Sequence, residues 1–184
     1  MDLQALINNT NYDHSRKVSQ ISGLMARKAG YSENESRIIE QAALFHDVGK
    51  SEIPKYILRK PASLTPEEYE TIKTHVTAGY KQLNEAAQIL GVASKVASDH
   101  HEHVDGYGYP HGITSNEMHD YAKLVACADV MDALYNRRAY KEPWSVSKIK
   151  EYFTARYGKQ FDPEMVKVLF SIMDDILQIY NEQE

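Results

Sequence analysis

Apolar residues at helical spacing run along nearly the whole chain and restrict its fold more than any other feature. One such stripe comes early in the sequence and consists of Val18, Ile21, Leu24, Met25 and Ala29. Recurrence at every third or fourth position is typical of an amphipathic helix. Residues 102–119 leave room for a short hairpin at most. We therefore expect an all-α protein, with about seven helices arranged as a single domain over residues 1–184.

Capping signals place the ends of several helices. Ser32 and Glu35 have the spacing of a capping box, which predicts a helix from there to Phe45. Thr65, followed by Pro66 and two glutamates, predicts the start of a helix that reaches about residue 84. Further helices are expected over residues 93–101, 121–136, 145–157 and 163 to about 180. Residues 49–63 and 102–115 are expected to be loops, and loops on a rigid frame commonly carry function.

Length and cysteine content limit the class of protein. A chain of 184 residues is long enough for a core without metal or disulfide support, so any metal site is expected to be functional. Cys127 is the only cysteine, which excludes an internal disulfide and a cysteine-rich zinc site and favours a reducing compartment. The sequence has neither a signal peptide nor an apolar run of membrane-spanning length. We expect a cytoplasmic monomer that does not associate with a membrane.

The formal net charge narrows the choice of ligand. At −5, it argues against binding to duplex nucleic acid, which depends on clustered Lys and Arg. A small anionic substrate is still compatible with this charge, because divalent cations can supply positive charge locally.

Several helical stripes carry a polar side chain on the face that should point into the core. These inward-facing residues are His14, His46, His75, His100 and Asp129. An ionised aspartate left unpaired in a core would be strongly destabilising or would take up a proton, so a cation is its expected partner. A lone inward histidine is more often an ordinary core residue, but five helices that direct such side chains inward indicate a shared metal centre.

Two doublets extend this set and suggest more than one metal ion. Adjacent residues on a helix point in different directions, so His46-Asp47 and His100-His101 can each serve two partners. Five histidines and two carboxylates exceed the capacity of one tetrahedral ion and suit two ions that also hold water. Imidazole and carboxylate without thiolate favour transition metals. We expect two divalent ions, Fe or Mn, with Zn, Ni or Co as alternatives.

Five sequence motifs, in order and spacing, resemble those of the HD-GYP family, a branch of the HD phosphohydrolase superfamily. The motifs are HDVGK at 46–50, EEYETIKTH at 67–75, HHEHVDGYGYP at 100–110, ADVMDAL at 128–134 and RRAYK at 137–141. The GYP part of the family name corresponds to the last three residues of the third motif, Gly108, Tyr109 and Pro110. This resemblance extends from about His14 to Tyr140 and so covers most of the chain.

The resemblance implies a cyclic di-GMP phosphodiesterase that produces pGpG, and in some members GMP, through a water activated by two metals. It implies a first metal held by His14, His46, Asp47 and Asp129. It implies a second metal held by Asp47, as a bridge, with His75, His100 and His101. It also implies substrate phosphate contacts from Lys50, Arg138 and Lys141, with Lys50 and Asp47 as the catalytic residues.

Departures from the family pattern bear on the metal count. Some members use a glutamate one turn before the first histidine to hold a third metal, and this chain has Thr10 there, which favours a dinuclear site. The usual Arg-Pro-Tyr is Arg138-Ala139-Tyr140, which removes a backbone constraint but no ligand. His103, His111 and His119 lie in or near the polar loop and are not expected to bind metal.

The GYP loop is open to two interpretations. Its glycines could shape a loop whose tyrosines stack on guanine or contact a partner, or Gly-Tyr-Gly-Tyr-Pro could be only a rigid turn. Two alternatives to the phosphodiesterase follow. One is a signalling module that binds a diguanylate cyclase or another partner through this loop. The other is an HD phosphohydrolase with a different cyclic dinucleotide or nucleotide as substrate, since metal ligands specify chemistry better than they specify a base.

Overall fold

The computed structural model describes residues 11–85, 87–136 and 143–181, and within them the chain forms nine α-helices, one 3-10 helix and no strand. The α-helices are α2 (Tyr12–Lys28), α3 (Glu33–Leu44), α4 (Lys55–Leu58), α5 (Pro66–Glu85), α6 (Ala87–Asp99), α7 (Asp120–Tyr135), α8 (Val146–Ala155), α9 (Pro163–Ser171) and α10 (Met173–Asn181). The 3-10 helix η1 (Val48–Glu52) follows α3. The expected all-α class is confirmed.

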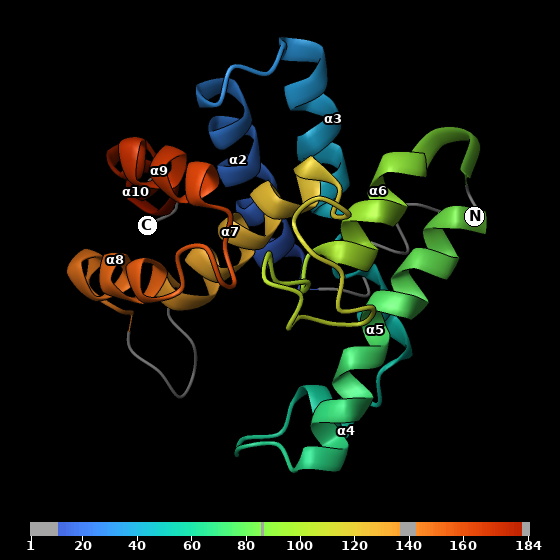
Figure 1. Ribbon diagram of the computed structural model, residues 1–184. Coiled ribbons are helices and arrows are strands. Elements are labelled where there is room, and N and C mark those ends of the chain that lie inside the picture. The colour runs from blue at the N-terminus through green and yellow to red at the C-terminus, as the bar shows by residue number, and fades with distance from the viewer. Residues whose placement is uncertain (1–10, 86, 137–142, 182–184) are drawn as a thin grey trace.

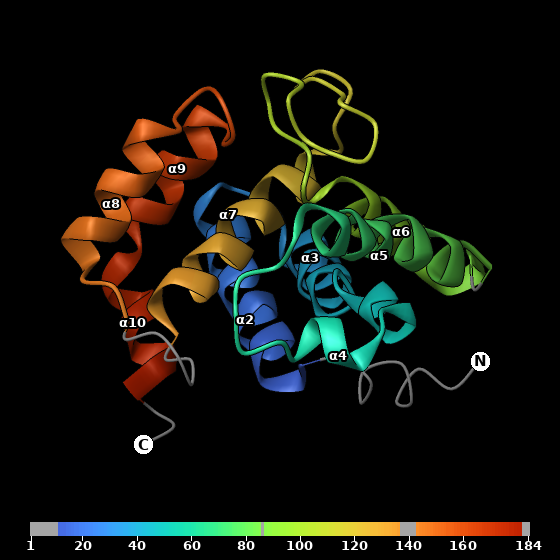
Figure 2. The ribbon, with the colours of Figure 1, turned by 90° about the horizontal axis from the view of Figure 1, so that it is seen from below.

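Helix α7 runs through the middle of the molecule and contacts α2, α3, α6, α8 and α9 (Figure 1). Its buried side chains lie all round the helix and include many small ones: Ala122, Leu124, Val125, Ala126, Cys127, Ala128, Met131, Asp132 and Leu134. A helix that is apolar on every side is typical of a central position in a core. Figure 2 shows α5 and α6 on one side of α7, and α8, α9 and α10 on the other.

The helix starts expected from capping signals are confirmed by their hydrogen bonds. Ser32 and Glu35 form the reciprocal bonds of a capping box at the start of α3. Thr65 and Glu68 do the same at α5, with the Thr65 amide donating to Glu68 at 2.8 Å. Asp162 caps α9, where Pro163 occupies the first turn and needs no hydrogen-bond donor.

Three segments differ from the sequence-based expectation. The apolar stripe after residue 163 forms two helices rather than one, because the backbone turns at the buried Ile172 and lets α10 pack against α2. Residues 49–63 are not all loop, since they contain most of η1 and the single-turn α4. Helix α6 begins at Ala87, six residues before the expected start. The chain therefore has more and shorter helices than the periodicity indicates.

Both doublets that the sequence analysis proposed as metal ligands lie just beyond the ends of their helices and not within them. Helix α3 ends at Leu44, so His46 and Asp47 occupy the turn that leads into η1. Helix α6 ends at Asp99, and His100 and His101 occupy the following turn. A turn gives adjacent side chains more directions than a helix does, which is what a doublet with two different partners needs.

The chain between α6 and α7 forms an irregular loop that projects to one side of the helices (Figure 2). The expected hairpin is reduced to one antiparallel bridge, between Asp105 and Thr114. Gly106 and Gly112 lie inside the segment that this bridge closes, and both have positive φ, at 82° and 65°, which residues other than glycine adopt with strain. Across the described part of the chain, we find no helix that is both long and apolar enough to cross a membrane.

Candidate metal centre

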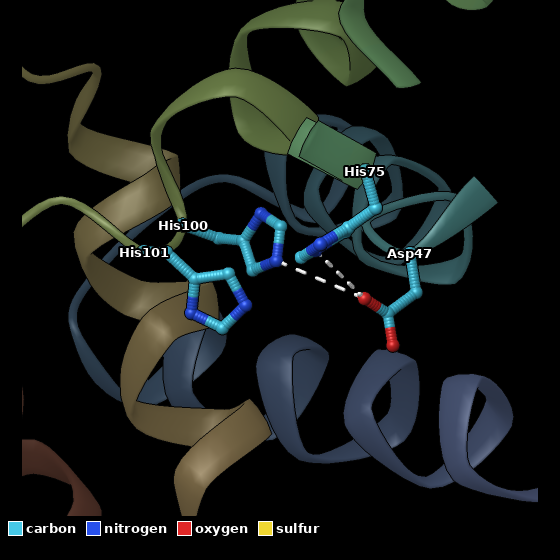
Figure 3. Close-up of side chains that lie close together, drawn as sticks. All are labelled: Asp47, His75, His100 and His101. Carbon is cyan, nitrogen blue, oxygen red and sulfur yellow. Dashed lines mark ion pairs between the residues drawn. The ribbon is translucent and has the colours of Figure 1, made fainter. Parts of the chain in front are cut away.

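Seven side chains from five parts of the fold converge below the loop between α6 and α7. They form two groups, and within each group the ligand atoms lie within 4.8 Å of one another. The first group is His14, His46 and Asp129, from α2, the turn after α3, and α7. The second group is Asp47, His75, His100 and His101, from the turns after α3 and α6 and from α5 (Figure 3). The structure thus brings together all seven residues that the sequence analysis proposed as metal ligands.

The carboxylate of Asp47 lies between the two groups and directs one oxygen to each. Its Oδ2 is 3.4 Å from the Nε2 of His46 and 3.8 Å from that of His14. Its Oδ1 is 3.3 Å from the Nε2 of His75 and 3.9 Å from that of His100. A carboxylate in this position can serve both groups at once, as the sequence analysis expected of Asp47.

Backbone carbonyls fix the orientation of three imidazoles. His46 Nδ1 donates to the Ala43 carbonyl and His75 Nδ1 to the Ile72 carbonyl, each at 2.7 Å. His100 Nδ1 donates to the Ala97 carbonyl at 3.0 Å. Because a carbonyl can only accept, the proton of each neutral ring must be on Nδ1, and Nε2 presents a lone pair.

Several inward-facing atoms of the site have no hydrogen bond to any residue that the structure describes. The Nε2 atoms of His46, His75 and His100 and the Oδ1 of Asp47 are buried and accept or donate no hydrogen bond. Buried polar atoms are normally satisfied, so a cluster of unsatisfied lone pairs needs a positive ligand. The residues present therefore fit divalent metal ions, which accept imidazole and carboxylate donors of this kind.

His14 differs from the other histidines in its hydrogen bonds and in its protonation. Burial alone would lower the pKa of His14, but hydrogen bonds to Asp129 and Asp132 raise it to about 10. Its Nε2 is 3.1 Å from Asp129 Oδ1, and its Nδ1 is 2.6 Å from Asp132 Oδ2. Burial would raise the pKa of Asp129, but the hydrogen bond from His14 holds it well below the usual range. A metal ion at the first group would therefore displace a proton from His14.

The protonation states in the second group suit the binding of a cation. Burial lowers the pKa of His101 to about 3 and that of His100 well below its usual range, so both rings are neutral at pH 7. Burial would raise the pKa of Asp47, but the positive charge of Lys50 holds it well below its usual range. The group thus combines neutral nitrogen donors with an ionised carboxylate, which is the form that metal ligation requires.

Asp132 and Tyr180 support the first group and were missed as functional residues in the sequence analysis. Asp132 is 1% exposed, and its Oδ1 accepts a 2.8 Å hydrogen bond from the Tyr180 hydroxyl of α10. Its other oxygen holds His14, as described above. A carboxylate that binds the outer nitrogen of a metal-binding histidine fixes the tautomer of that ring. The available signal was a second aspartate three residues after Asp129, on a helix that is otherwise largely apolar.

Lys50 and Gly49 follow Asp47 in η1 and shape the same site. Lys50 Nζ forms an ion pair with Asp47 Oδ2 at 2.5 Å, and the lysine side chain is 32% exposed. A Cβ on Gly49 would collide with the carbonyl of His75 and the amide of Gly79. Only glycine lets η1 approach α5 closely enough to place Asp47 beside His75.

The GYP loop packs against the second group. Tyr109 stacks on His101, with ring centroids 4.9 Å apart and an interplanar angle of 26°. A Cβ on Gly108 would collide with the backbone of Glu102 and His103. The buried Glu102 accepts from the His111 amide at 2.6 Å and so closes the loop on itself. The loop glycine therefore serves geometry, while Tyr109 contacts a proposed ligand directly.

The remaining residues named in the sequence analysis are placed as follows. His119 caps α7, where its Nδ1 accepts from the Tyr121 amide at 3.2 Å. His103 and His111 lie in the loop, outside the two groups. Pro110 follows Tyr109 through a cis peptide bond. Thr10, Arg138, Ala139, Tyr140 and Lys141 lie outside the described residues, so their expected roles stay predictions.

Comparison with known proteins places the chain among HD-domain proteins. The family model for the HD domain matches residues 1–165. A cyclic di-GMP phosphodiesterase response regulator, RpfG, of Xanthomonas campestris is 42% identical over 83% of this chain and 41% of its own length. A cyclic di-GMP phosphodiesterase of Thermotoga maritima is 37% identical over 93% of this chain and 47% of its own length. The chain spans less than half the length of these relatives.

Solved structures share the fold at low sequence identity. Bd1817, an HDG"Y"P protein from Bdellovibrio bacteriovorus, superposes with a TM-score of 0.74 at 22% identity, covering 90% of this chain and 53% of that one. The HD domain of the L. monocytogenes phosphodiesterase PgpH, in complex with cyclic-di-AMP, gives a TM-score of 0.69 at 20% identity, covering 97% and 96%. The family match and the shared fold, together with the complete signature from His46 to Pro110, establish that the chain belongs to the HD domain family, in its HD-GYP branch.

Proposed function

We propose that this chain is a metal-dependent phosphodiesterase that hydrolyses cyclic di-GMP to the linear dinucleotide pGpG. The observation that carries the proposal is Asp47, with one oxygen directed to each of two groups of metal-type ligands. Relatives named as cyclic di-GMP phosphodiesterases support the choice of substrate. We further propose that residues 1–184 form one HD-GYP domain.

The proposed centre holds two divalent ions, Fe or Mn. His14, His46, Asp47 and Asp129 hold the first ion, and Asp47, His75, His100 and His101 hold the second. Ions in such a pair lower the pKa of bound water and neutralise charge on a phosphodiester. The unsatisfied Nε2 atoms and the Asp47 oxygens support this ligand assignment.

The remaining chemistry belongs to side chains of the chain itself. Asp47 fixes the spacing of the two groups, because its two oxygens are part of one rigid carboxylate. Lys50 is held beside Asp47 by their ion pair, and its partly exposed ammonium can donate to a phosphate oxygen that approaches the centre. Arg138 and Lys141 stay proposed phosphate contacts on the sequence resemblance alone.

The test is metal analysis and product chromatography. The chain, purified with Mn or anaerobically with Fe(II), should contain about two ions per molecule and convert cyclic di-GMP to pGpG. Asp47→Ala should lose both ions and all turnover, whereas Lys50→Ala should keep the ions and lose rate. A protein that holds two ions but leaves cyclic di-GMP intact would overturn the proposed function.

Parallel incubations test the alternatives. The comparisons include a 3'3'-cGAMP-specific phosphodiesterase of Vibrio cholerae, 35% identical over 90% of this chain and 32% of its own length. Hydrolysis of 3'3'-cGAMP in preference to cyclic di-GMP would therefore assign the hybrid dinucleotide as substrate. Capture of a diguanylate cyclase without hydrolysis of any dinucleotide would instead support the signalling module.

A further inference from the structure

A row of aromatic rings leads from the second metal group to the protein surface. His101 stacks on Tyr109, and Tyr109 meets the ring of Tyr69 edge to face, with centroids 6.5 Å apart and planes at 79°. Tyr109 comes from the loop after α6, whereas Tyr69 lies near the start of α5, the helix that also carries His75. The row therefore joins α5, which carries His75, to the loop that follows His101.

A cation accompanies these rings. Lys73 lies one turn after Tyr69 on α5, and its Nζ is 5.7 Å from the centroid of both Tyr69 and Tyr109. Glu70 forms an ion pair with Lys73 at 2.6 Å and helps to keep the ammonium over the rings. Such distances are typical of cation–π contacts, so a positive charge lies beside the two tyrosine rings.

The row begins where the second group opens to solvent. Asp47, His75 and His100 are buried, but His101 is only partly buried, and Tyr109 beside it is partly buried as well. At the outer end, Tyr69 is 48% exposed and the Lys73 side chain is 27% exposed. An anionic group held at the second group would thus have the exposed Tyr69 ring and the Lys73 ammonium at the solvent-facing end of this row of rings.

The chemistry of these groups matches a nucleobase, and guanine in particular. Exposed tyrosine rings stack on any base, because every base has a π face. A lysine ammonium donates to the O6 and N7 acceptors of guanine, whereas adenine presents an amino donor in place of O6. The combination of Tyr69 and Lys73 therefore favours guanine over adenine.

We propose that Tyr69 and Lys73, backed by Tyr109, bind one guanine base of the substrate while its phosphodiester lies at the metal centre. This assignment rests on the proposed function and adds to it a source of base selectivity that lies outside the metal ligands. Tyr69 and Lys73 act in binding and selectivity, and neither contacts the reacting phosphorus.

The experiment compares a nucleotide with a substrate that has no base. Tyr69→Ala should raise KM for cyclic di-GMP about 5- to 150-fold, the effect of losing one stacked base, and should lower kcat/KM for bis(p-nitrophenyl) phosphate, whose smaller rings offer less stacking area and no guanine edge, by a much smaller factor. Tyr69→Phe keeps the ring and should behave like the unsubstituted chain. Tyr56→Ala is the matched control, because Tyr56 is a 74% exposed tyrosine of α4 outside the row. Lys73→Met should lower the preference for cyclic di-GMP over cyclic di-AMP.

The outcomes separate this inference from the proposed function. If Tyr69→Ala leaves KM for cyclic di-GMP unchanged, or slows both substrates equally, the guanine site is wrong. If the metal-loaded chain hydrolyses neither substrate, the proposed function is wrong, and calorimetric binding of cyclic di-GMP then tests the guanine site alone. Weaker binding by Tyr69→Ala would support the site, and equal or undetectable binding in both proteins would overturn it.

Discussion

Substitution of Asp132 tests whether support from behind His14 sets the metal affinity of the first group. The carboxylate is 1% exposed and holds His14 Nδ1 at 2.6 Å, so no water can readily replace it. Asp132→Asn removes the negative charge and no longer enforces one tautomer of His14. Loss of such a supporting partner weakens metal binding about 10- to 100-fold, or about 1.4 to 2.8 kcal/mol.

Tyr180→Phe provides a graded comparison at the same position. It removes only the hydroxyl that donates to Asp132 at 2.8 Å, and it leaves the contact between Asp132 and His14 in place. The loss of one hydrogen bond of about 0.5 to 1.5 kcal/mol should weaken metal binding only about 2- to 10-fold. Comparing the metal affinities of the two variants therefore shows how much the hydrogen bond from Tyr180 of α10 contributes to metal binding at the first group.

The assay is a competition titration against a chromogenic chelator, analysed as two binding steps. Asp132→Asn should weaken the step assigned to the first group and change the second step less. Circular dichroism should show the same helical content in both proteins. An unchanged first step in a folded Asp132→Asn protein would refute the idea that Asp132 orients His14.

Three further predictions follow from the site. Gly49→Ala should lower the free energy of unfolding, measured by urea denaturation, by about 1 to 3 kcal/mol, because the added Cβ would collide with the His75 and Gly79 backbone. Gly91→Ala is the control, because an added Cβ there meets nothing within 4 Å, and it should raise the free energy of unfolding by up to about 1 kcal/mol. Metal affinity at the first group should rise up to about tenfold per pH unit below about pH 10, because binding removes the proton that His14 holds up to that pH; a pH-independent titration would contradict this. Lys50→Ala should lower kcat about 100- to 1000-fold with two ions still bound by metal analysis, and a normal kcat would exclude its phosphate role.

Local patterns predicted much of the fold and the members of the centre. Helical periodicity and capping residues located most of the helices, because these signals depend on neighbours within a few positions. The inward histidines could be found for the same reason, since a polar residue on an apolar stripe is visible in the sequence alone. The resemblance to HD-GYP proteins then supplied the division of ligands between two ions, with Asp47 shared.

Contacts between distant segments could not be predicted in this way. Asp132 and His14 are separated by 118 positions, and Tyr180 by a further 48 from Asp132, so no local pattern links them. The turn at Ile172 likewise depends on α10 packing against α2, although the apolar stripe continues through it. The row from His101 to Tyr69 also joins separate elements, which explains why Tyr69 and Lys73, although they lie in the EEYETIKTH motif, could not be linked to Tyr109 from the sequence.

The position of Asp47 has a thermodynamic consequence for metal loading. If each group holds an ion as proposed, one carboxylate serves both, so an ion bound at either group would change the affinity of the other, and linkage requires the two changes to be equal. Occupancy of such a pair could not be assigned to independent sites with separate constants. A preparation with one ion per chain on average would then be a mixture of empty, singly and doubly loaded molecules, and its composition would depend on that coupling.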